Sequence, residues 1–107
     1  PIGIGDITKH HKYDIVDENN TIAIECKRIT WTETGNVPSA KMGHCNEAAF
    51  YLHLLPNTYE KYIVIYYSYS VKRKESLAEY YKRTYKHLLG DIKVAEYNPK
   101  TNEFRVV

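Results

Sequence analysis

The stretch TIAIECKRITW, residues 21–31, constrains the fold more than any other part of the sequence. Along it, apolar residues alternate with a mixed set that includes two charges. A period of two is typical of a β-strand with two different faces. The alternation assigns one set to the core: Ile22, Ile24 and Cys26. Glu25 and Lys27, together with Ala23, are then expected on the opposite face.

A second β-prone segment, HKYDIV at residues 11–16, precedes this strand, and the turn-forming letters DENN lie between the two. The pair predicts an antiparallel hairpin. Asp14 lies near the middle of the first strand, so the hairpin can bring it beside Glu25 and Lys27. Two neighbouring carboxylates repel unless a cation lies between them or one takes a proton. Mg²⁺ suits such oxygen ligands, and a nearby lysine can orient water or stabilise charge on a phosphate.

The rest of the chain predicts alternating helices and strands. Residues 32–38 have the composition of a loop, Ser39 is placed to cap a helix, and Pro56 ends that helix. Residues 60–70 form a β-branched and aromatic run typical of a central strand. A second helix is expected over residues 75–89 with Gly90 at its end, followed by two strands around a turn. The order β-β-α-β-α-β-β predicts an α/β fold with a mixed central sheet flanked by helices.

Helical spacing predicts which side chains of the two helices face inward. In the first helix they are Cys45, Ala48 or Ala49, Leu52 and Leu55. In the second helix they are Leu77, Tyr81, Thr84 or Tyr85, and Leu88. Polar residues of the first helix fall on another face: Lys41, His44 and Glu47, with Tyr51.

Length, charge and cysteine content limit the classes of protein to consider. The chain has 107 residues, which suits one domain spanning residues 1–107. A net charge of +2 permits nucleic-acid binding without requiring it. The two cysteines are too few for a disulfide framework and lack the spacing of a zinc site. No apolar run is long enough for a membrane helix and no secretory signal is evident, so we expect a soluble, cytoplasmic protein with no membrane partner.

The segment YDIVDENNTIAIECK resembles the core motif of the PD-(D/E)xK nuclease superfamily, which includes restriction endonucleases and archaeal Holliday-junction resolvases. The resemblance implies a restriction-endonuclease-like core and a nuclease that uses Mg²⁺ or Mn²⁺. It makes Asp14 and Glu25 the metal ligands and Lys27 the catalytic lysine. The backbone carbonyl of Cys26 is implied as a further metal ligand.

The resemblance is incomplete before the motif. The family usually has Pro where this chain has Tyr13, and many members begin with a helix that carries another Glu. Residues 1–11 predict no such helix and contain no Glu. An acid on the helix after the motif can take this role, which makes Glu47 a candidate fourth member of the site. Asp6 is a weaker substitute.

Basic side chains after the motif are candidates for contacts with DNA. They are Arg28, Lys41, His44, Lys72, Arg73 and Lys74. Such cations can bind a phosphate backbone, but the same residues also suit an ordinary solvated surface.

The sequence therefore leads to three hypotheses of different classes. The first is a metal-dependent endonuclease that hydrolyses phosphodiester bonds of duplex or branched DNA, as a homodimer if both strands are cut. The second is a catalytically inactive nucleic-acid-binding module of the same fold. The third is a structural or protein-interaction domain whose charged strand faces water. The sequence leaves RNA open as an alternative substrate.

Overall fold

A mixed β-sheet of five strands forms the centre of the protein, seen in a computed structural model that describes residues 2–4, 7–9, 13–19 and 21–107. Across the sheet the strands are β3 (Ile15–Val16), β4 (Ile22–Lys27), β5 (Glu60–Tyr66), β8 (Lys93–Asn98) and β9 (Glu103–Val106). The three central strands are parallel, and both edge strands are antiparallel to their neighbours. The prediction of an α/β fold with a mixed sheet is confirmed.

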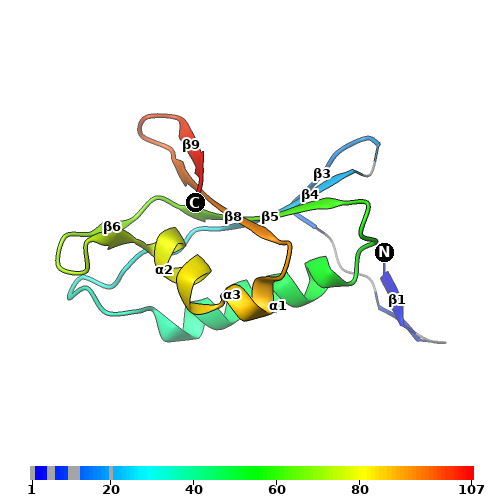
Figure 1. Ribbon diagram of the computed structural model, residues 1–107, viewed down its shortest axis with the longest axis horizontal. Coiled ribbons are helices and arrows are strands. Elements are labelled where there is room, and N and C mark those ends of the chain that lie inside the picture. The colour runs from blue at the N-terminus through cyan, green and yellow to red at the C-terminus, as the bar shows by residue number, and fades with distance from the viewer. Residues whose placement is uncertain (1, 5–6, 10–12, 20) are drawn as a thin grey trace.

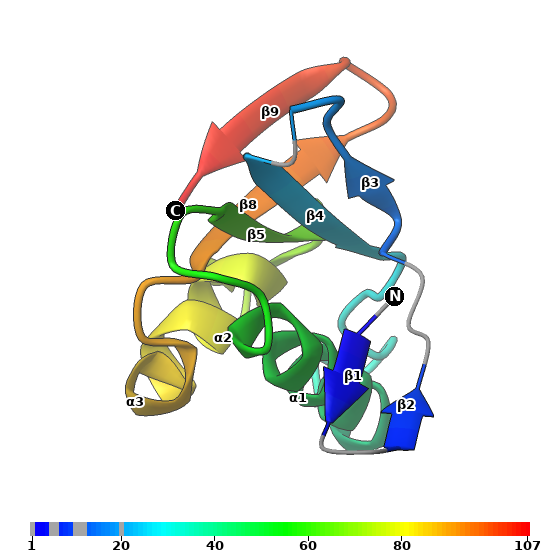
Figure 2. The same cartoon turned by 90° about the vertical axis from the view of Figure 1, so that its right-hand side faces the viewer.

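Three helices connect the parallel strands, because parallel neighbours cannot be joined by a tight turn. Helix α1 (Ser39–His53) leads from β4 to β5, and helices α2 (Leu77–Thr84) and α3 (Lys86–Leu89) lead from β5 to β8. All three lie on the same side of the sheet (Figures 1 and 2). One sheet face is therefore packed against helices, and no described helix covers the other.

The face of strand β4 that packs against the helices is the opposite of the predicted one. Ala23 is fully buried and Glu25 is 3% exposed, whereas Cys26 is exposed and Ile24 only half-buried. The prediction that Ile22, Ile24 and Cys26 enter the core is therefore wrong. Two alanines of α1 share the core with Ala23, and such small side chains allow a helix to pack closely on a sheet. The isoleucines lie instead on the open face.

Helix α1 buries most of the stripe that its sequence predicts, together with Met42, but it ends at His53, so the predicted Leu55 follows the helix and is only half-buried. The buried side chains are Met42, Cys45, Ala48, Ala49 and Leu52. Lys41, His44 and Glu47 are exposed, as expected. The helix starts at Ser39, but the residue in the N-cap position is Pro38, and no side chain caps this end.

The second predicted helix is divided in two at Tyr85, whose backbone (φ −111°, ψ 23°) leaves the helical conformation. The break shifts the phase of the buried side, so Leu89 is 2% exposed while the predicted Leu88 is 39% exposed. Ser76 caps α2 by accepting a hydrogen bond from the backbone of Glu79 (3.2 Å). Gly90 ends α3 with a φ of +58°, as its position in the sequence predicts.

Two small hairpins accompany the main sheet, and the sequence predicted neither. One pairs β1 (Ile2–Ile4) with β2 (Ile7–Lys9), and the other pairs β6 (Tyr69–Ser70) with β7 (Glu75–Ser76). Strands of two or three residues are too short to give a clear periodic signal. Asp6 lies outside the described residues.

Candidate functional site

The hairpin of β3 and β4 brings Asp14 next to the segment that carries Glu25, Cys26 and Lys27. Strand β3 begins at Ile15, which pairs with Ile24, so Asp14 lies just before the strand and the prediction that it lies near the middle is wrong. The backbone N–H of Cys26 donates a hydrogen bond to Oδ2 of Asp14 (2.7 Å). Oδ1 of this exposed carboxylate accepts no hydrogen bond from the rest of the described chain.

Glu25 and Lys27 lie on the helix-covered face of β4. Their parallel neighbours on β5 are Ile63 and Ile65, both fully buried on that face. Glu25 is 3% exposed, and Lys27 is half-buried near the end of the strand. A carboxylate in such surroundings carries a large desolvation cost, which a nearby cation reduces. The strand thus places an acid and a lysine two residues apart on one side of the sheet.

The charged groups of the motif influence the thiol of Cys26. Partial burial raises the pKa of Cys26, and the negative charges of Asp14 and Glu25 raise it further. The positive charge of Lys27 acts in the opposite direction. Because Glu25 and Lys27 flank Cys26 in the sequence, only the effect of Asp14 reflects a contact made by the fold.

Tyr13 attaches this region to α1, a contact that the sequence analysis missed. Its hydroxyl donates a hydrogen bond to the backbone carbonyl of Tyr51 (2.7 Å). Burial raises the pKa of Tyr13 to about 12, and the charge of Glu25 adds to the effect. Tyr13 directly precedes Asp14, but no local pattern in the sequence predicts its contact with a helix 38 residues later.

Helix α1 brings Cys45 to the motif rather than Glu47. Burial raises the pKa of the Cys45 thiol to about 11, and the charge of Lys27 reduces this effect. Glu47 follows two residues later, about 200° further round the helix, and is exposed. Within the described ranges, no three His, Cys, Asp or Glu side chains gather as a metal site, so Glu47 does not join Asp14 and Glu25.

The donors at the motif still suit a hard divalent ion. Asp14 and Glu25 offer carboxylate oxygens, and Mg²⁺ in proteins is commonly held by one or two carboxylates while keeping several waters. Such an ion needs no third acidic side chain, so the chemistry of the residues fits it.

The residues predicted to contact DNA divide into separate groups. Lys41 and His44 are exposed on α1, while the guanidinium of Arg28 lies over the ring of Tyr66 (5.5 Å). Lys72, Arg73 and Lys74 form the tip of the β6–β7 hairpin.

Arg73 joins this hairpin tip to the loop that follows β4. Its Nε donates to the carbonyl of Gly35 (2.8 Å), and its guanidinium lies over the rings of Trp31 (5.0 Å) and Tyr80 (5.9 Å). These contacts fix the side chain of Arg73 in place. Lys72 and Lys74 beside it remain exposed, at the end of the sheet where the parallel strands finish.

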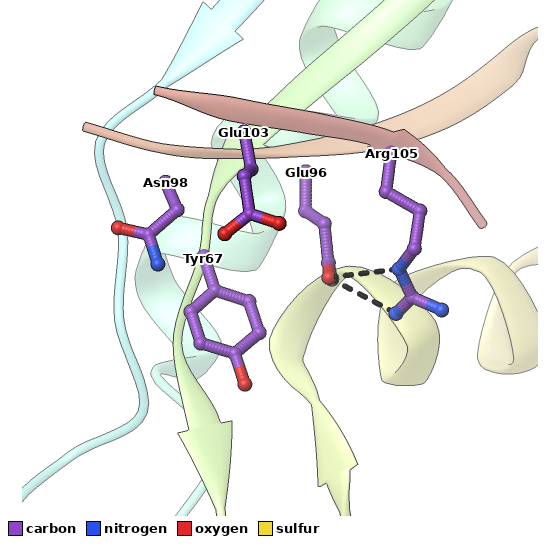
Figure 3. A pocket seen from close by; sticks show the side chains of 5 residues that line it. All are labelled: Tyr67, Glu96, Asn98, Glu103 and Arg105. Carbon is purple, nitrogen blue, oxygen red and sulfur yellow. Dashed lines mark hydrogen bonds and ion pairs between the residues drawn. The ribbon is translucent and has the colours of Figure 1, made fainter. Parts of the chain in front are cut away.

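A polar pocket of about 270 Å³ lies between the end of β8, β9 and Tyr67 (Figure 3). Glu96 is 5% exposed there and accepts hydrogen bonds from Ser76 Oγ (2.6 Å) and from Nε and Nη2 of Arg105 (3.1 and 3.0 Å). Its two oxygens are therefore already engaged. The hydrogen bonds of Glu96 thus connect the start of α2 to β9 at the edge of the sheet. None of the motif residues lines this pocket.

The open face of the sheet holds a wider trough of about 570 Å³. Its floor includes Ile24, Val64 and Tyr66, and its sides are formed by Ile15 of β3 and Phe104 of β9. Asp14, Cys26 and Arg28 also line it. Asp14 thus borders the open face, while Glu25 and Lys27 lie on the helix side.

Among the described residues, no helix has the length and apolar character needed to cross a lipid bilayer. Comparison of the chain with protein families, curated proteins and solved structures finds no match.

Proposed function

We propose that the protein is a metal-dependent endonuclease with a restriction-endonuclease-like core that hydrolyses phosphodiester bonds in DNA. The observation that carries the proposal is the 2.7 Å hydrogen bond from the Cys26 amide to Asp14, because it holds the first acid of the motif against its Glu-Cys-Lys segment. An isolated match to a short motif carries little weight. Here Asp14 also hydrogen-bonds to the backbone of the strand that carries Glu25 and Lys27.

The chain's own residues have distinct roles in this proposal. Asp14 and Glu25, with the carbonyl of Cys26, would hold Mg²⁺ or Mn²⁺. The bound ion supplies charge neutralisation at the phosphate and a more acidic water. Lys27 is on the same face as Glu25, where its ammonium can donate to the attacking water or to a phosphate oxygen. Glu47 has no role in this proposal, because it is exposed on α1 and does not join Asp14 and Glu25.

Several exposed cations are available to bind the DNA backbone. Lys41 and His44 lie on α1, Arg28 follows the motif, and Lys72, Arg73 and Lys74 form the hairpin tip. Contacts of this kind give affinity without sequence preference and weaken as salt increases. A homodimer would supply the two sites needed to cut both strands.

The test is cleavage of a panel of duplex, single-stranded and four-way-junction DNA, with RNA included, in Mg²⁺, in Mn²⁺ and with a chelator. We expect metal-dependent cleavage that Lys27→Ala reduces by about 100-fold or more, because one lost stabilising group typically costs that much. Lys100→Ala, which removes an exposed lysine from the turn before β9, is the matched control and should cleave normally. Circular dichroism confirms that both variants fold.

Cleavage that persists in Lys27→Ala, or no cleavage of any substrate, would reject the nuclease. Salt-sensitive DNA binding without cleavage would instead support an inactive binding module. One observation favours this second candidate: within the part of the chain that is described, no third acidic side chain lies near Asp14 and Glu25.

A further inference from the structure

Strand β9 forms an edge of the main sheet, and its four residues, Glu103 to Val106, are all exposed. The N–H of Val107 donates to the carbonyl of Val94 (2.9 Å), which continues the β8–β9 pairing. In an antiparallel ladder, residues that bond to one neighbour alternate with residues whose backbone groups point away from it. Arg105 and Glu103 therefore bond to β8, whereas Phe104 and Val106 direct their N–H and C=O groups outward.

The side chains of β9 also differ between its two faces. Phe104 lines the trough on the open face, and Val106, two residues later, lies on the same side of the strand; they are 55% and 49% exposed. Glu103 and Arg105 lie on the helix side, as Figure 3 shows. The carboxylate of Glu103 has no hydrogen bond or ion pair within the described chain, and Nη1 of Arg105 is also unused there.

One register of a second copy at that edge pairs opposite charges. An antiparallel pair of identical strands has a two-fold axis along the sheet normal, which keeps the open faces on the same side. A two-fold axis at Phe104 places Glu103 of each copy opposite Arg105 of the other, which gives two such pairs. An axis through Arg105 would oppose two arginines, and an axis through Glu103 would oppose two glutamates. Opposite charges in directly facing positions stabilise a strand pair, and like charges destabilise it.

We propose that two copies of the protein associate through β9 in this register, which joins two sheets into one of ten strands. The Phe104 backbones exchange two hydrogen bonds across the axis, and their rings meet on the open face. The unused Nη1 of Arg105 and the carboxylate of Glu103 supply two ion pairs on the helix side. A four-residue edge is small compared with a standard interface, so the dimer should be weak and should depend on concentration. This inference does not depend on the nuclease activity.

Disulfide cross-linking tests the register. In a Cys26→Ser background, which removes the exposed native thiol, we expect Phe104→Cys to form a covalent dimer on mild oxidation. The two Cα atoms would be about 5.5 Å apart, within the range for a disulfide. Val106→Cys is the matched control, since its two copies would lie about 13 Å apart along the strands. Equal cross-linking of both variants, or none of Phe104→Cys in folded protein, would overturn the proposal.

Charge reversal tests the ion pairs without new thiols. We expect sedimentation velocity to show dimers of the unchanged chain as concentration rises, and mostly monomers for Glu103→Arg. Glu18→Arg makes the same change at an exposed turn beside the opposite edge, and it should behave like the unchanged chain. A chain that stays monomeric at all concentrations, or an equal effect of both variants, would show that β9 is not the interface.

Discussion

The two cysteines lie 19 positions apart in the sequence, and the structure gives them different surroundings. Both are free; Cys26 is exposed at the open face, and Cys45 is completely buried between α1 and the sheet. The pKa of each thiol is raised, mainly by burial, and at Cys26 also by Asp14 and Glu25. The thiolate is the reactive form of cysteine, so both groups are poor nucleophiles near neutral pH.

Thiol titration with a disulfide reagent should separate the two. We expect one equivalent to react in the folded protein, slowly near neutral pH and faster as the pH rises through the raised pKa of Cys26. The second equivalent should react only after denaturation, since Cys45 is inaccessible. Cys26→Ser should remove the first phase and leave the second. Two equivalents of equal reactivity in the folded chain would contradict the buried position of Cys45.

At the scale of elements, the sequence predicted the components that have strong local signals. Strand β5, helix α1 and the last two strands follow from apolar periodicity and from turn residues. The hairpin turn predicts that Asp14 approaches the segment of Glu25 and Lys27, but not that it bonds to the Cys26 amide at the open face while those two side chains lie on the helix side. The buried face of β4 does not, because alternation defines two faces without showing which one the helices cover. The break at Tyr85 and the contact of Tyr13 with Tyr51 depend on tertiary packing and leave no local pattern.

Helix α2 should depend on Ser76 far more than α1 depends on Ser39. The Ser76 hydroxyl accepts from the Glu79 backbone and donates to buried Glu96 (2.6 Å). Ser76→Ala should therefore lower the free energy of unfolding by about 2 kcal/mol or more, the sum of a lost cap and a lost bond to a buried charge. Ser39→Ala removes an exposed hydroxyl that caps nothing, so its effect should stay within about 0.5 kcal/mol. Urea denaturation measures both, and similar losses would show that the cap and the Glu96 bond are unimportant.

For the whole molecule, shifted pKa values limit the pH range of full stability on both sides. Hydrogen bonds from Thr21 lower the pKa of Asp17, and a hydrogen bond from Lys93 lowers that of Glu60. A lowered carboxyl pKa stabilises the fold above the ordinary value, and this contribution is lost as the pH falls through the folded value. Burial raises the pKa of Cys45 and Tyr13, so their contributions are complete at low pH and are lost as the pH rises.

The free energy of unfolding should therefore be nearly constant around neutral pH and fall in alkaline solution. For Cys45 the contribution is complete below its ordinary pKa of 9.0 and is lost by about pH 11, where the folded group titrates. Urea denaturation at one pH below and one pH above this interval measures how much free energy of unfolding each protein loses as the pH rises. The loss should be about 2 kcal/mol smaller in Cys45→Ala than in the unchanged chain. The comparison uses the difference between the two pH values, because the smaller side chain also lowers stability at every pH by leaving a cavity. An equal loss in both proteins would show that burial of this thiol does not control the alkaline limit of the fold.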